Sequence, residues 1–358
     1  MEKYRVLAIN PGSTSTKIAV YDDEEKILTS SIDYTAEEID SYANIIDQFD
    51  MRSKSIIGVL EENDIHVESL NAVVGRGGAL TPVNSGAYEV NDEMVDFLRN
   101  RPVIEHASNL GGVIAKSIAD PLGIKAYIYD AVAVDEMSDL ARVTGIKGIE
   151  RPSFGHALNT RAMALKYAKD NNLEYKDLNL IVAHVGGGAT VYLHNKGRIS
   201  DMLSDDEGPM SPQRSGRIPG GKLVDLCFSG EYSKKEIMTM IRGKGGIVSH
   251  LNTVDVREVE KMIEDGDKKA ELIYDAMIYQ IAKGVGEMAT VVDGDVDAII
   301  VTGGIAYSEK FSKALTKRIQ FISKVAIMAG ENELESLAFG ALRVLKGEEK
   351  AWQFTENK

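Results

Sequence analysis

The sequence contains very little cysteine and tryptophan, with one residue of each in 358. The single cysteine, Cys227, cannot form a disulfide within the chain, so nothing in the composition calls for an oxidising compartment. We expect Cys227 to pack inside the protein, because free cysteine behaves as a small hydrophobic residue. With six histidines and this one thiol, the chain lacks the ligand clusters typical of a dedicated zinc site.

Long apolar runs and an excess of basic residues are also missing. No segment approaches the roughly 18 uncharged apolar residues of a membrane-spanning helix, and residues 1–10 hold too short an apolar run to resemble a signal peptide. The 41 Lys and Arg residues face 55 Asp and Glu residues, for a net charge of -14. Nucleic acids and anionic membranes bind clustered basic side chains. We therefore expect neither as a partner, and we expect a cytoplasmic location.

Two copies of one pattern are present instead, at residues 8–20 and 183–193. Each copy is an apolar strand that ends in a polar residue, Asn10 or His184, followed by a turn of small residues and a β-branched strand. Such a turn leaves backbone N–H groups and hydroxyls uncovered, so a phosphate can approach them closely. One copy in each half of the chain predicts a nucleotide held between two related domains.

Hydrophobic periodicity supports two α/β domains, and the chain is long enough and, at 44% hydrophobic, apolar enough to bury both cores. Alternating patterns predict strands over residues 4–10, 16–21, 26–34, 72–74, 125–129, 180–185, 189–194, 197–201 and 297–302. Helical spacing predicts helices over about 40–62, 160–170 and 335–345, with others after 220. A long helix carries one apolar stripe, a core or subunit-interface feature, made of Tyr274, Ile278, Ile281, Val285, Met288 and Val292. The tail from 346 to 358 is too polar to be core.

Two arginines lie in loops of small residues, Arg76 within Gly75-Arg76-Gly77 and Arg214 before Ser215. In such a loop a guanidinium can bind a ligand with two hydrogen bonds, although an isolated loop arginine is more often a surface charge. If the acceptor is a carboxylate, its attack on a polyphosphate brings two anions together and requires fixed positive charge. An ionised carboxylate needs no catalytic base, whereas a hydroxyl acceptor does. The pair therefore favours a carboxylate kinase.

Eight short motifs, in this order and spacing, resemble the acetate kinase (acetokinase) family over nearly the whole chain. They are Asn-Pro-Gly-Ser-Thr-Ser-Thr-Lys at 10–17, Gly-Arg-Gly-Gly at 75–78, His-Ala-Ser-Asn-Leu-Gly at 106–111, the strand-ending Asp130, His-Ala-Leu-Asn at 156–159, His-Val-Gly-Gly-Gly at 184–188, Gly-Pro-Met-Ser-Pro-Gln-Arg-Ser-Gly at 208–216 and Thr-Gly-Gly-Ile at 302–305. The resemblance implies two ribonuclease-H-like (actin-like ATPase) domains with mixed sheets flanking a nucleotide cleft. We place them at residues 1–152 and 153–334, and we expect a C-terminal helix, about 335–358, to pack back on the first domain.

The same resemblance implies roles for individual residues. Those for phosphate and nucleotide are Asn10, Ser13, Ser15 and Lys17 on the γ-phosphate side, His184, Gly186, Gly187 and Gly188 at the β-phosphate, Asp255 and Arg257 at the ribose, and Gly303, Gly304 and Ile305 at the adenine. Taken alone, Asp255 and Arg257 would be an exposed helix start, and Ser308 has a sufficient role as the cap of the next helix.

Magnesium is the metal that the resemblance implies, and hard oxygen ligands suit it. The implied ligands are Asn10, Asp130 and Glu333, with Glu331 as a near alternative to Glu333. Asp130 ends a strand, where α/β folds place ligands. The resemblance makes it a magnesium or phosphoryl-transfer residue, that is, a catalytic residue rather than a proton acceptor, but from the sequence alone it could also cap a helix near Val132.

The variants of the motifs match the butyrate kinases within this family. Residues 156–159 replace a motif with two histidines in acetate kinases, so either His156 or Asn159 takes the transition-state position. Gly77 and Gly78 stand where a valine is usual, which we expect to leave room for a longer acyl chain. Residues expected near that pocket are His106, Leu110 and Pro209.

The predicted function is the phosphorylation of a short-chain carboxylate by ATP with Mg²⁺. Butyrate or a branched relative such as isobutyrate would become an acyl phosphate, in a reaction that also runs backwards to make ATP. The alternatives are an acetate or propionate kinase and, less favoured, an actin- or Hsp70-like ATPase. The family resemblance also implies a homo-oligomer, a dimer or larger.

Overall fold

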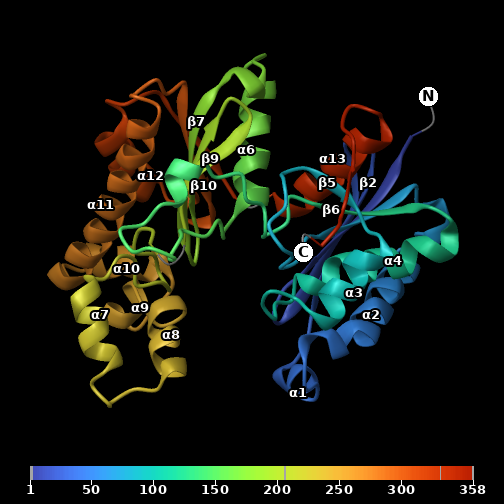
Figure 1. The fold of residues 1–358 in the computed structure, drawn as a ribbon, viewed down its shortest axis with the longest axis horizontal. Coiled ribbons are helices and arrows are strands. Elements are labelled where there is room, and N and C mark those ends of the chain that lie inside the picture. Colours follow the sequence, from blue (N-terminus) through green and yellow to red (C-terminus); the bar gives the residue numbers. More distant parts are fainter. Residues whose placement is uncertain (1–2, 205–206, 331, 357–358) are drawn as a thin grey trace. The chain divides into compact units, whose positions relative to one another are not determined.

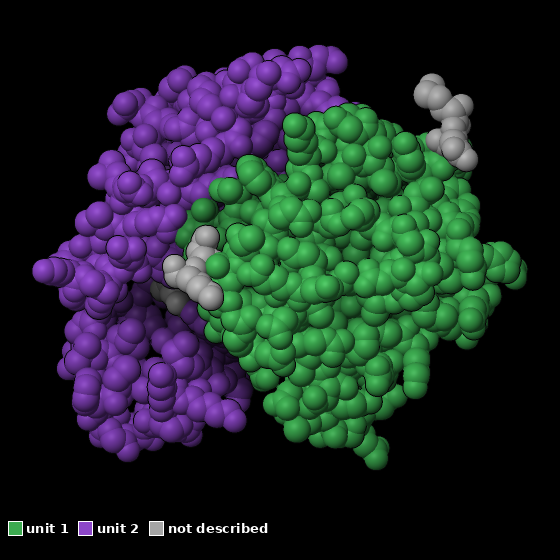
Figure 2. Space-filling model, turned by 45° about the vertical axis from the view of Figure 1, so that its right-hand side comes forward, with its two compact units in different colours: residues 1–135, 332–358 green, residues 136–331 purple. Residues whose placement is uncertain are grey.

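The computed structural model describes residues 3–204, 207–330 and 332–356 (Figure 1). The chain forms two compact units (Figure 2): the first contains residues 1–135 and 332–358, and the second contains residues 136–331. Each unit holds one mixed β-sheet with helices on its faces. None of the helices in the described ranges is long and apolar enough to cross a membrane.

The sheet of the first unit has seven strands, in the order β12-β5-β6-β4-β1-β2-β3. Its strands are β1 (Arg5–Pro11), β2 (Ser15–Asp22), β3 (Glu25–Asp33), β4 (Ala72–Arg76), β5 (Ala87–Glu89), β6 (Lys125–Tyr129) and β12 (Trp352–Gln353). The first three form an antiparallel meander. Strand β4 runs parallel to β1, and β6 runs parallel to β4, so all three end at the same edge of the sheet.

Helices α4 (Asn109–Ala119) and α13 (Glu333–Leu345) cover opposite faces of this sheet. A Cβ atom on Gly75 would lie 2.1 Å from the carbonyl oxygen of Gly111 in α4, and one on Gly340 of α13 would lie 2.3 Å from the ring of Tyr129. Tyr129 pairs with Arg76, one position beyond Gly75. Because successive side chains of a strand point to opposite faces, α4 lies against one face and α13 against the other.

The remaining helices of this unit are α1 (Ala36–Asp40), η1 (Ile45–Gln48), α2 (Phe49–Glu62), η2 (Val67–Ser69), α3 (Asp92–Asn100) and η3 (Asp120–Leu122). The single helix expected over about 40–62 is therefore wrong in its first part. Only α2 is a long helix there, and α1 and η1 are separate short turns.

The C-terminal segment differs from the expected single helix over 335–358. Helix α13 ends at Leu345, and β12 then pairs with β5 in the sheet. Phe354 is 1% exposed and packs edge-on against Phe97, with ring centroids 5.6 Å apart. The expectation that the tail is too polar to join the core is thus wrong at Phe354, because one aromatic side chain suffices to anchor an otherwise polar segment.

The sheet of the second unit has five strands, in the order β11-β10-β7-β8-β9. They are β7 (Asn179–Val185), β8 (Ala189–Asn195), β9 (Arg198–Leu203), β10 (Ala298–Gly303) and β11 (Val325–Ala329). Strands β7, β8 and β9 form an antiparallel meander, and β7, β10 and β11 are parallel. Strands β1, β2, β3, β4 and β6 of the first unit have the same arrangement, so the internal repeat predicted from the sequence is confirmed.

Two helices pack on the faces of this sheet, α6 (Ala157–Asp170) and α11 (Lys268–Val291). The odd-numbered residues Ile181 and Ala183 of β7 belong to the core cluster under α11. The even-numbered Leu180 and Val182 belong to the cluster under α6. The first five residues of the predicted stripe in the long helix, Tyr274 through Met288 in the order given above, are buried in the cluster under α11, and the sixth, Val292, packs against this cluster. The stripe is therefore a core feature.

The other helices of the second unit are α5 (Asp139–Arg142), η4 (Tyr175–Asp177), α7 (Gly220–Cys227), α8 (Lys234–Arg242), α9 (Ile247–Leu251), α10 (Val256–Glu264), η5 (Gly304–Tyr307) and α12 (Glu309–Ile319). Cys227, at the end of α7, is exposed. The expectation that it packs in the core is wrong, since α7 buries none of its residues.

The division between the units falls at residues 135 and 136, earlier than the expected 152 and 153. The segment in between binds to the second unit. The N–H of Ser138 donates to the carbonyl of Ser200 at 2.9 Å, and Arg151 forms ion pairs with Asp201 at 3.0 Å and with Glu207 at 2.9 Å. Asp201 and Glu207 lie 50 and 56 residues further along the chain than Arg151, so no local pattern points to them.

Candidate active site

The first small-residue turn joins β1 to β2 in the first unit. Asn10 and Lys17 face each other across this hairpin, and Asn10 is only 7% exposed. The side chains of Ser13, Thr14 and Lys17 are exposed, and none of them hydrogen-bonds to another described residue. The turn therefore presents two hydroxyls and an ammonium group that the fold itself does not use.

Asn10, Arg76 and Glu333 form a polar cluster beside this hairpin. Strands β1 and β4 are parallel, with Ile9 opposite Gly75, so Asn10 and Arg76 lie at the same edge of the sheet. Arg76 Nη1 donates to Glu333 Oε2 at 3.1 Å, and it lies 3.4 Å from Asn10 Oδ1. Asn10 Nδ2 donates to the same Glu333 oxygen at 2.5 Å. Glu333 opens α13, so the C-terminal helix supplies the carboxylate; Glu331 lies outside the described residues.

Asp130 follows β6 at this edge and is 2% exposed. Its backbone has φ of 40°, a left-handed conformation that is unfavourable for most side chains and is often found at functional sites. Its Oδ1 accepts a hydrogen bond from the N–H of Gly86 at 2.7 Å, and its own N–H donates to the Gly86 carbonyl at 3.1 Å. Asp130 caps no helix, because the next helix in the described chain, α5, begins at Asp139 with Ser138 as its N-cap.

Packing explains Gly77 and Gly78 better than an open pocket does. A Cβ atom on Gly77 would lie 2.5 Å from the Cβ of Ala131, and one on Gly78 would lie 2.6 Å from Asn109 Oδ1. The space beside both glycines is therefore already filled. The expectation that these glycines leave room for a longer acyl chain is wrong, because they permit close contact between the Arg76 loop and its neighbours.

The three residues expected near the acyl chain differ in accessibility. Leu110 is fully buried in α4, and Pro209 of the second unit is buried too. His106 is exposed, and its Nδ1 contacts Ser108 Oγ at 2.8 Å. Partial burial of the ring and then the positive charge of Arg76 lower the pKa of His106. Of the three, only His106 presents an accessible side chain near Arg76.

The second small-residue turn joins β7 to β8 in the second unit and is closed by its own backbone. The N–H of Gly186 donates to the carbonyl of Gly188 at 2.8 Å. Ser211 Oγ donates to the carbonyl of Gly187 at 2.8 Å. A Cβ atom on Gly188 would lie 2.6 Å from Cζ of Arg214, so the Arg214 guanidinium lies directly against this turn. The structure thus brings two of the sequence-predicted features together.

His184, His156 and Asn159 form a compact group behind this turn. His184 is even-numbered in β7 and therefore points to the α6 face, where its Nδ1 hydrogen-bonds Asn159 Oδ1 at 2.9 Å. The rings of His156 and His184 stack with centroids 4.1 Å apart, and His156 Nδ1 contacts Thr190 Oγ1 at 3.1 Å. Asn159 is fully buried, whereas His156 is partly exposed. The two alternatives for the transition-state position thus differ in access to a ligand.

The loop predicted to bind adenine follows β10. Gly303 has φ of 94° and lies so close to β7 that a Cβ atom would come within 2.3 Å of the Val185 carbonyl oxygen. Gly304 is exposed and Ile305 is partly exposed. Ser308 caps α12 by accepting the N–H of Phe311 at 3.0 Å, which confirms its predicted structural role.

Asp255 and Arg257 contact each other at the start of α10. Asp255 caps the helix, and its Oδ2 forms an ion pair with Arg257 Nη2 at 2.6 Å. These contacts with Arg257 lower the pKa of Asp255 to about 2. The Arg257 side chain is 89% exposed, so the pair forms an exposed helix start, and its role at a ribose stays a prediction.

Comparisons with known proteins show which sequences are related to this chain. Residues 146–345 match the acetokinase family. Butyrate kinase 1 of Clostridium acetobutylicum is 51% identical over 353 residues, which cover 98% of this chain and 99% of that protein. The chain belongs to the acetokinase family. Butyrate kinase 2 of the same organism is 47% identical over 354 residues, with the same coverage.

Solved structures in this family share the fold. Acetate kinase of Porphyromonas gingivalis superposes with a TM-score of 0.79 at 20% identity, covering 96% of this chain and all of the other. A propionate kinase of Francisella tularensis subsp. tularensis superposes with a TM-score of 0.74 at 19% identity, covering 94% and 98%. The two-domain fold class expected from the sequence is confirmed.

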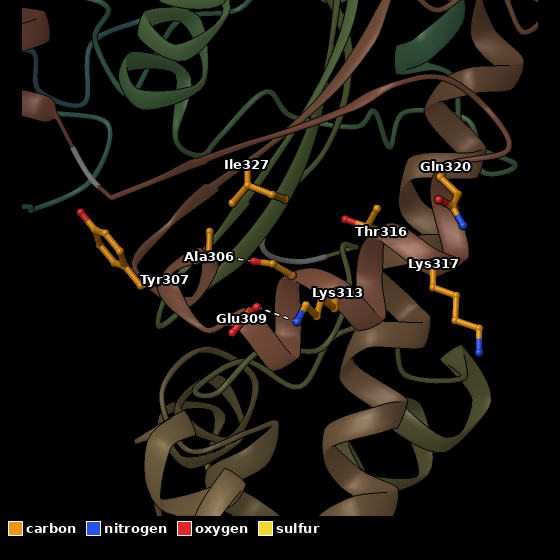
Figure 3. A pocket seen from close by; sticks show the side chains of 9 residues that line it. Ala306, Tyr307, Glu309, Lys313, Thr316, Lys317, Gln320 and Ile327 are labelled. Atoms are coloured by element: carbon orange, nitrogen blue, oxygen red, sulfur yellow. Dashed lines mark hydrogen bonds and ion pairs between the residues drawn. The ribbon is translucent and has the colours of Figure 1, made fainter.

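A pocket of about 480 Å³ lies between α12 and β11, beginning at Ala306 and Tyr307 just after the predicted adenine loop (Figure 3). Lys313 and Glu309 form an ion pair on one side of it, and Ile327 of β11 lies on the other. None of the site residues predicted for this acetokinase family member lines it.

Arg52 is a residue beside the first turn that sequence reasoning missed. It lies on α2, it is fully buried, and it hydrogen-bonds the β1–β2 hairpin. A signal was present in the sequence, because Arg52, Ile56 and Leu60 recur at four-residue spacing and form the buried face of α2. An arginine on an apolar stripe indicates a charge that is buried together with the stripe.

Proposed function

We propose that this chain transfers the γ-phosphoryl group of ATP to a short-chain carboxylate, butyrate or a branched relative such as isobutyrate, and that it also catalyses the reverse reaction. The main support is sequence similarity. The chain is 51% and 47% identical to two proteins named butyrate kinase, over nearly the whole length of each. The polar cluster around Arg76 supplies the chemistry that such a reaction needs, since it offers a fixed positive charge at a strand edge where ligands bind.

Arg76 is the group we assign to the carboxylate. Its Nη1 binds Glu333, while its Nε is buried and donates to no acceptor among the described residues. A guanidinium left with an unused donor gains a hydrogen bond when an anionic oxygen binds it. The acceptor carboxylate is already ionised and attacks phosphorus directly, so the residues around it need to bind and orient rather than remove a proton.

Magnesium fits the donor set of the first unit. No group of three His, Cys, Asp or Glu side chains gathers in the described part of the chain, but Mg²⁺ usually takes one or two carboxylates and completes its shell with water and phosphate oxygens. Glu333 and Asp130, with the amide oxygen of Asn10, are the residues we assign to it. When bound, the ion neutralises charge on the phosphates.

His156, rather than Asn159, is our assignment for the transition-state position. Asn159 is fully buried and uses its amide oxygen to hold His184, whereas His156 is partly exposed and stacks on His184. We expect His156→Ala to lower kcat about tenfold to a hundredfold with little change in KM, because a transition-state contact acts on kcat. If His156→Ala keeps the kcat of the native enzyme in a steady-state assay, the assignment is wrong.

Each small-residue turn has its own proposed role in nucleotide binding. We assign the γ-phosphate side to Ser13, Ser15 and Lys17, and the β-phosphate to the turn at residues 186–188 with Arg214. The adenine would lie on residues 303–305, where two glycines let a flat ring approach the backbone. The cytoplasmic location, the homo-oligomeric state and the absence of nucleic-acid and membrane partners stay predictions.

The acyl-chain preference tests this proposal. Purified protein would be incubated with ATP, Mg²⁺ and acetate, propionate, butyrate or isobutyrate, and the acyl phosphate would be trapped with hydroxylamine. We expect the highest kcat/KM for butyrate or isobutyrate. A highest value for acetate or propionate would replace the proposed substrate, and no product with any acid would overturn the carboxylate kinase itself.

A further inference from the structure

Arg52 carries a buried charge that the fold does not neutralise. Its side chain is fully buried, and among the described residues it forms no ion pair. All of its partners are neutral oxygens. Its donors bind Gln48 Oε1 twice, at 3.0 Å and 2.8 Å, Ser15 O at 3.0 Å, Thr16 Oγ1 at 2.9 Å and Ser13 O at 3.2 Å. The ring of Tyr34 lies 4.7 Å from its Cζ atom. A charge buried without a counter-ion is costly.

The contacts of Arg52 determine how the first hairpin is oriented. The guanidinium binds the carbonyls of Ser13 and Ser15, and the N–H of Tyr34 binds the carbonyl of Thr14 at 2.9 Å. Three successive carbonyls are thus held by buried groups. Because the C=O and N–H of a trans peptide point in opposite directions, the Thr14 N–H points away from Arg52. It donates to no described acceptor, and Thr14 is exposed.

We propose that Arg52 is a positioning residue that holds the β1–β2 hairpin from beneath and supplies a fixed counter-charge for the terminal phosphates of a nucleotide. The inference rests on the proposed function only for the identity of the ligand. Because its surroundings have a low dielectric constant, the charge of Arg52 can attract a phosphate on the other side of the hairpin backbone. The hydrogen bond from Arg52 to the Ser13 carbonyl also polarises that peptide group, which makes the Thr14 N–H a stronger donor.

The neighbouring glutamine allows the charge to be tested without removing Arg52. Gln48 is 4% exposed and accepts two hydrogen bonds from Arg52. Gln48→Glu has the same shape and keeps both hydrogen bonds, but it places a carboxylate against the guanidinium. Asn63→Asp is the matched control, because it makes the same amide-to-carboxylate change on an exposed residue at the other end of α2.

Affinities would be measured by calorimetry for ATP, ADP and adenosine, each with Mg²⁺ and without any carboxylate. In Gln48→Glu we expect about tenfold weaker binding of ATP, a smaller loss for ADP and no change for adenosine, which carries no phosphate. Asn63→Asp should bind all three normally. Arg52→Lys, which keeps the charge but not the planar fork, should keep more ATP affinity than Arg52→Met.

Equal ATP affinity in Gln48→Glu and Asn63→Asp would overturn the proposal that Arg52 acts as a counter-charge. An equal loss of affinity for ATP and for adenosine in Gln48→Glu would overturn it as well. Since Gln48→Glu preserves the packing, the result does not depend on whether Arg52→Met folds. The outcome is also separate from the proposed function. Failure of the proposed function would appear as a native protein that makes no acyl phosphate, whereas failure of the Arg52 inference would leave acyl phosphate formation by the native protein unchanged.

Discussion

The two small-residue turns have the same strand order behind them, yet they are built in opposite ways. The β1–β2 turn exposes hydroxyls and is held from inside by the buried Arg52. The β7–β8 turn has no side chains of its own, and Arg214 packs directly on Gly188. The β1–β2 turn thus presents its own polar side chains above the buried charge of Arg52. The β7–β8 turn presents only backbone groups, beside the partly exposed charge of Arg214. The same supersecondary unit can therefore present hydrogen-bond donors in two physically different ways.

Removing either arginine assigned to the ligand should have the largest effect. We expect Arg76→Ala and Arg214→Ala each to lower kcat/KM about a hundredfold to a thousandfold, because each removes a fixed charge from developing anions. Steady-state acyl phosphate formation would measure this, with circular dichroism to confirm folding. Arg217→Ala is the matched control, since that exposed arginine pairs with Glu287 and should matter little. Near-native activity in both arginine variants would contradict the carboxylate kinase mechanism.

Adding one methyl group to each turn should separate the two designs. In Gly188→Ala the new Cβ would lie 2.6 Å from Arg214 Cζ, so this flexible side chain must move. We expect a folded protein whose kcat falls about tenfold to a hundredfold, since a misplaced catalytic group costs that much. In Gly12→Ala the new atom would lie 3.4 Å from the Ser15 carbonyl oxygen, an ordinary contact, and activity should stay within about twofold. Equal losses of activity in Gly188→Ala and Gly12→Ala would contradict the inference that the two turns are built differently.

The second unit buries His194, and we expect this burial to make the stability of the protein sensitive to acid. His194 in β8 is fully buried, with its Nδ1 2.8 Å from the Tyr175 hydroxyl, and burial, followed by the charge of Arg161, lowers its pKa to about 3. The unfolded chain binds this proton near pH 6.5 and the folded chain does not, so stability is present above pH 6.5 and is lost as the pH falls toward 3. Between pH 7 and pH 5 this amounts to about 2 kcal/mol.

Urea unfolding of the native protein and of His194→Gln at pH 7, 6 and 5 would measure the effect. The free energy of unfolding should depend less on pH in the variant. His66→Gln, at an exposed position of the first unit, should keep the pH dependence of the native protein. A variant His194→Gln with the native slope would show that this histidine does not set the acid sensitivity.

Much of the site was predictable because its residues form local patterns. The strands, the two turns and the arginines between small residues all depend on neighbours a few positions apart, and the structure shows these elements at the predicted places. The unit boundary was not predictable in this way. It depends on contacts with distant residues, such as those of Arg151 with Asp201 and Glu207.

By itself, the sequence determined the internal repeat, most of the strands, the family and the small residues of the two turns, since periodicity and turn residues act locally. Only the tertiary structure decided that Glu333 binds Arg76, that Gly77 and Gly78 serve packing, that Asn159 holds His184, and that Arg52 lies beneath the first turn. These contacts join residues 25 to 257 positions apart. Their formation depends on how helices pack on the sheets, and no short stretch of sequence encodes it.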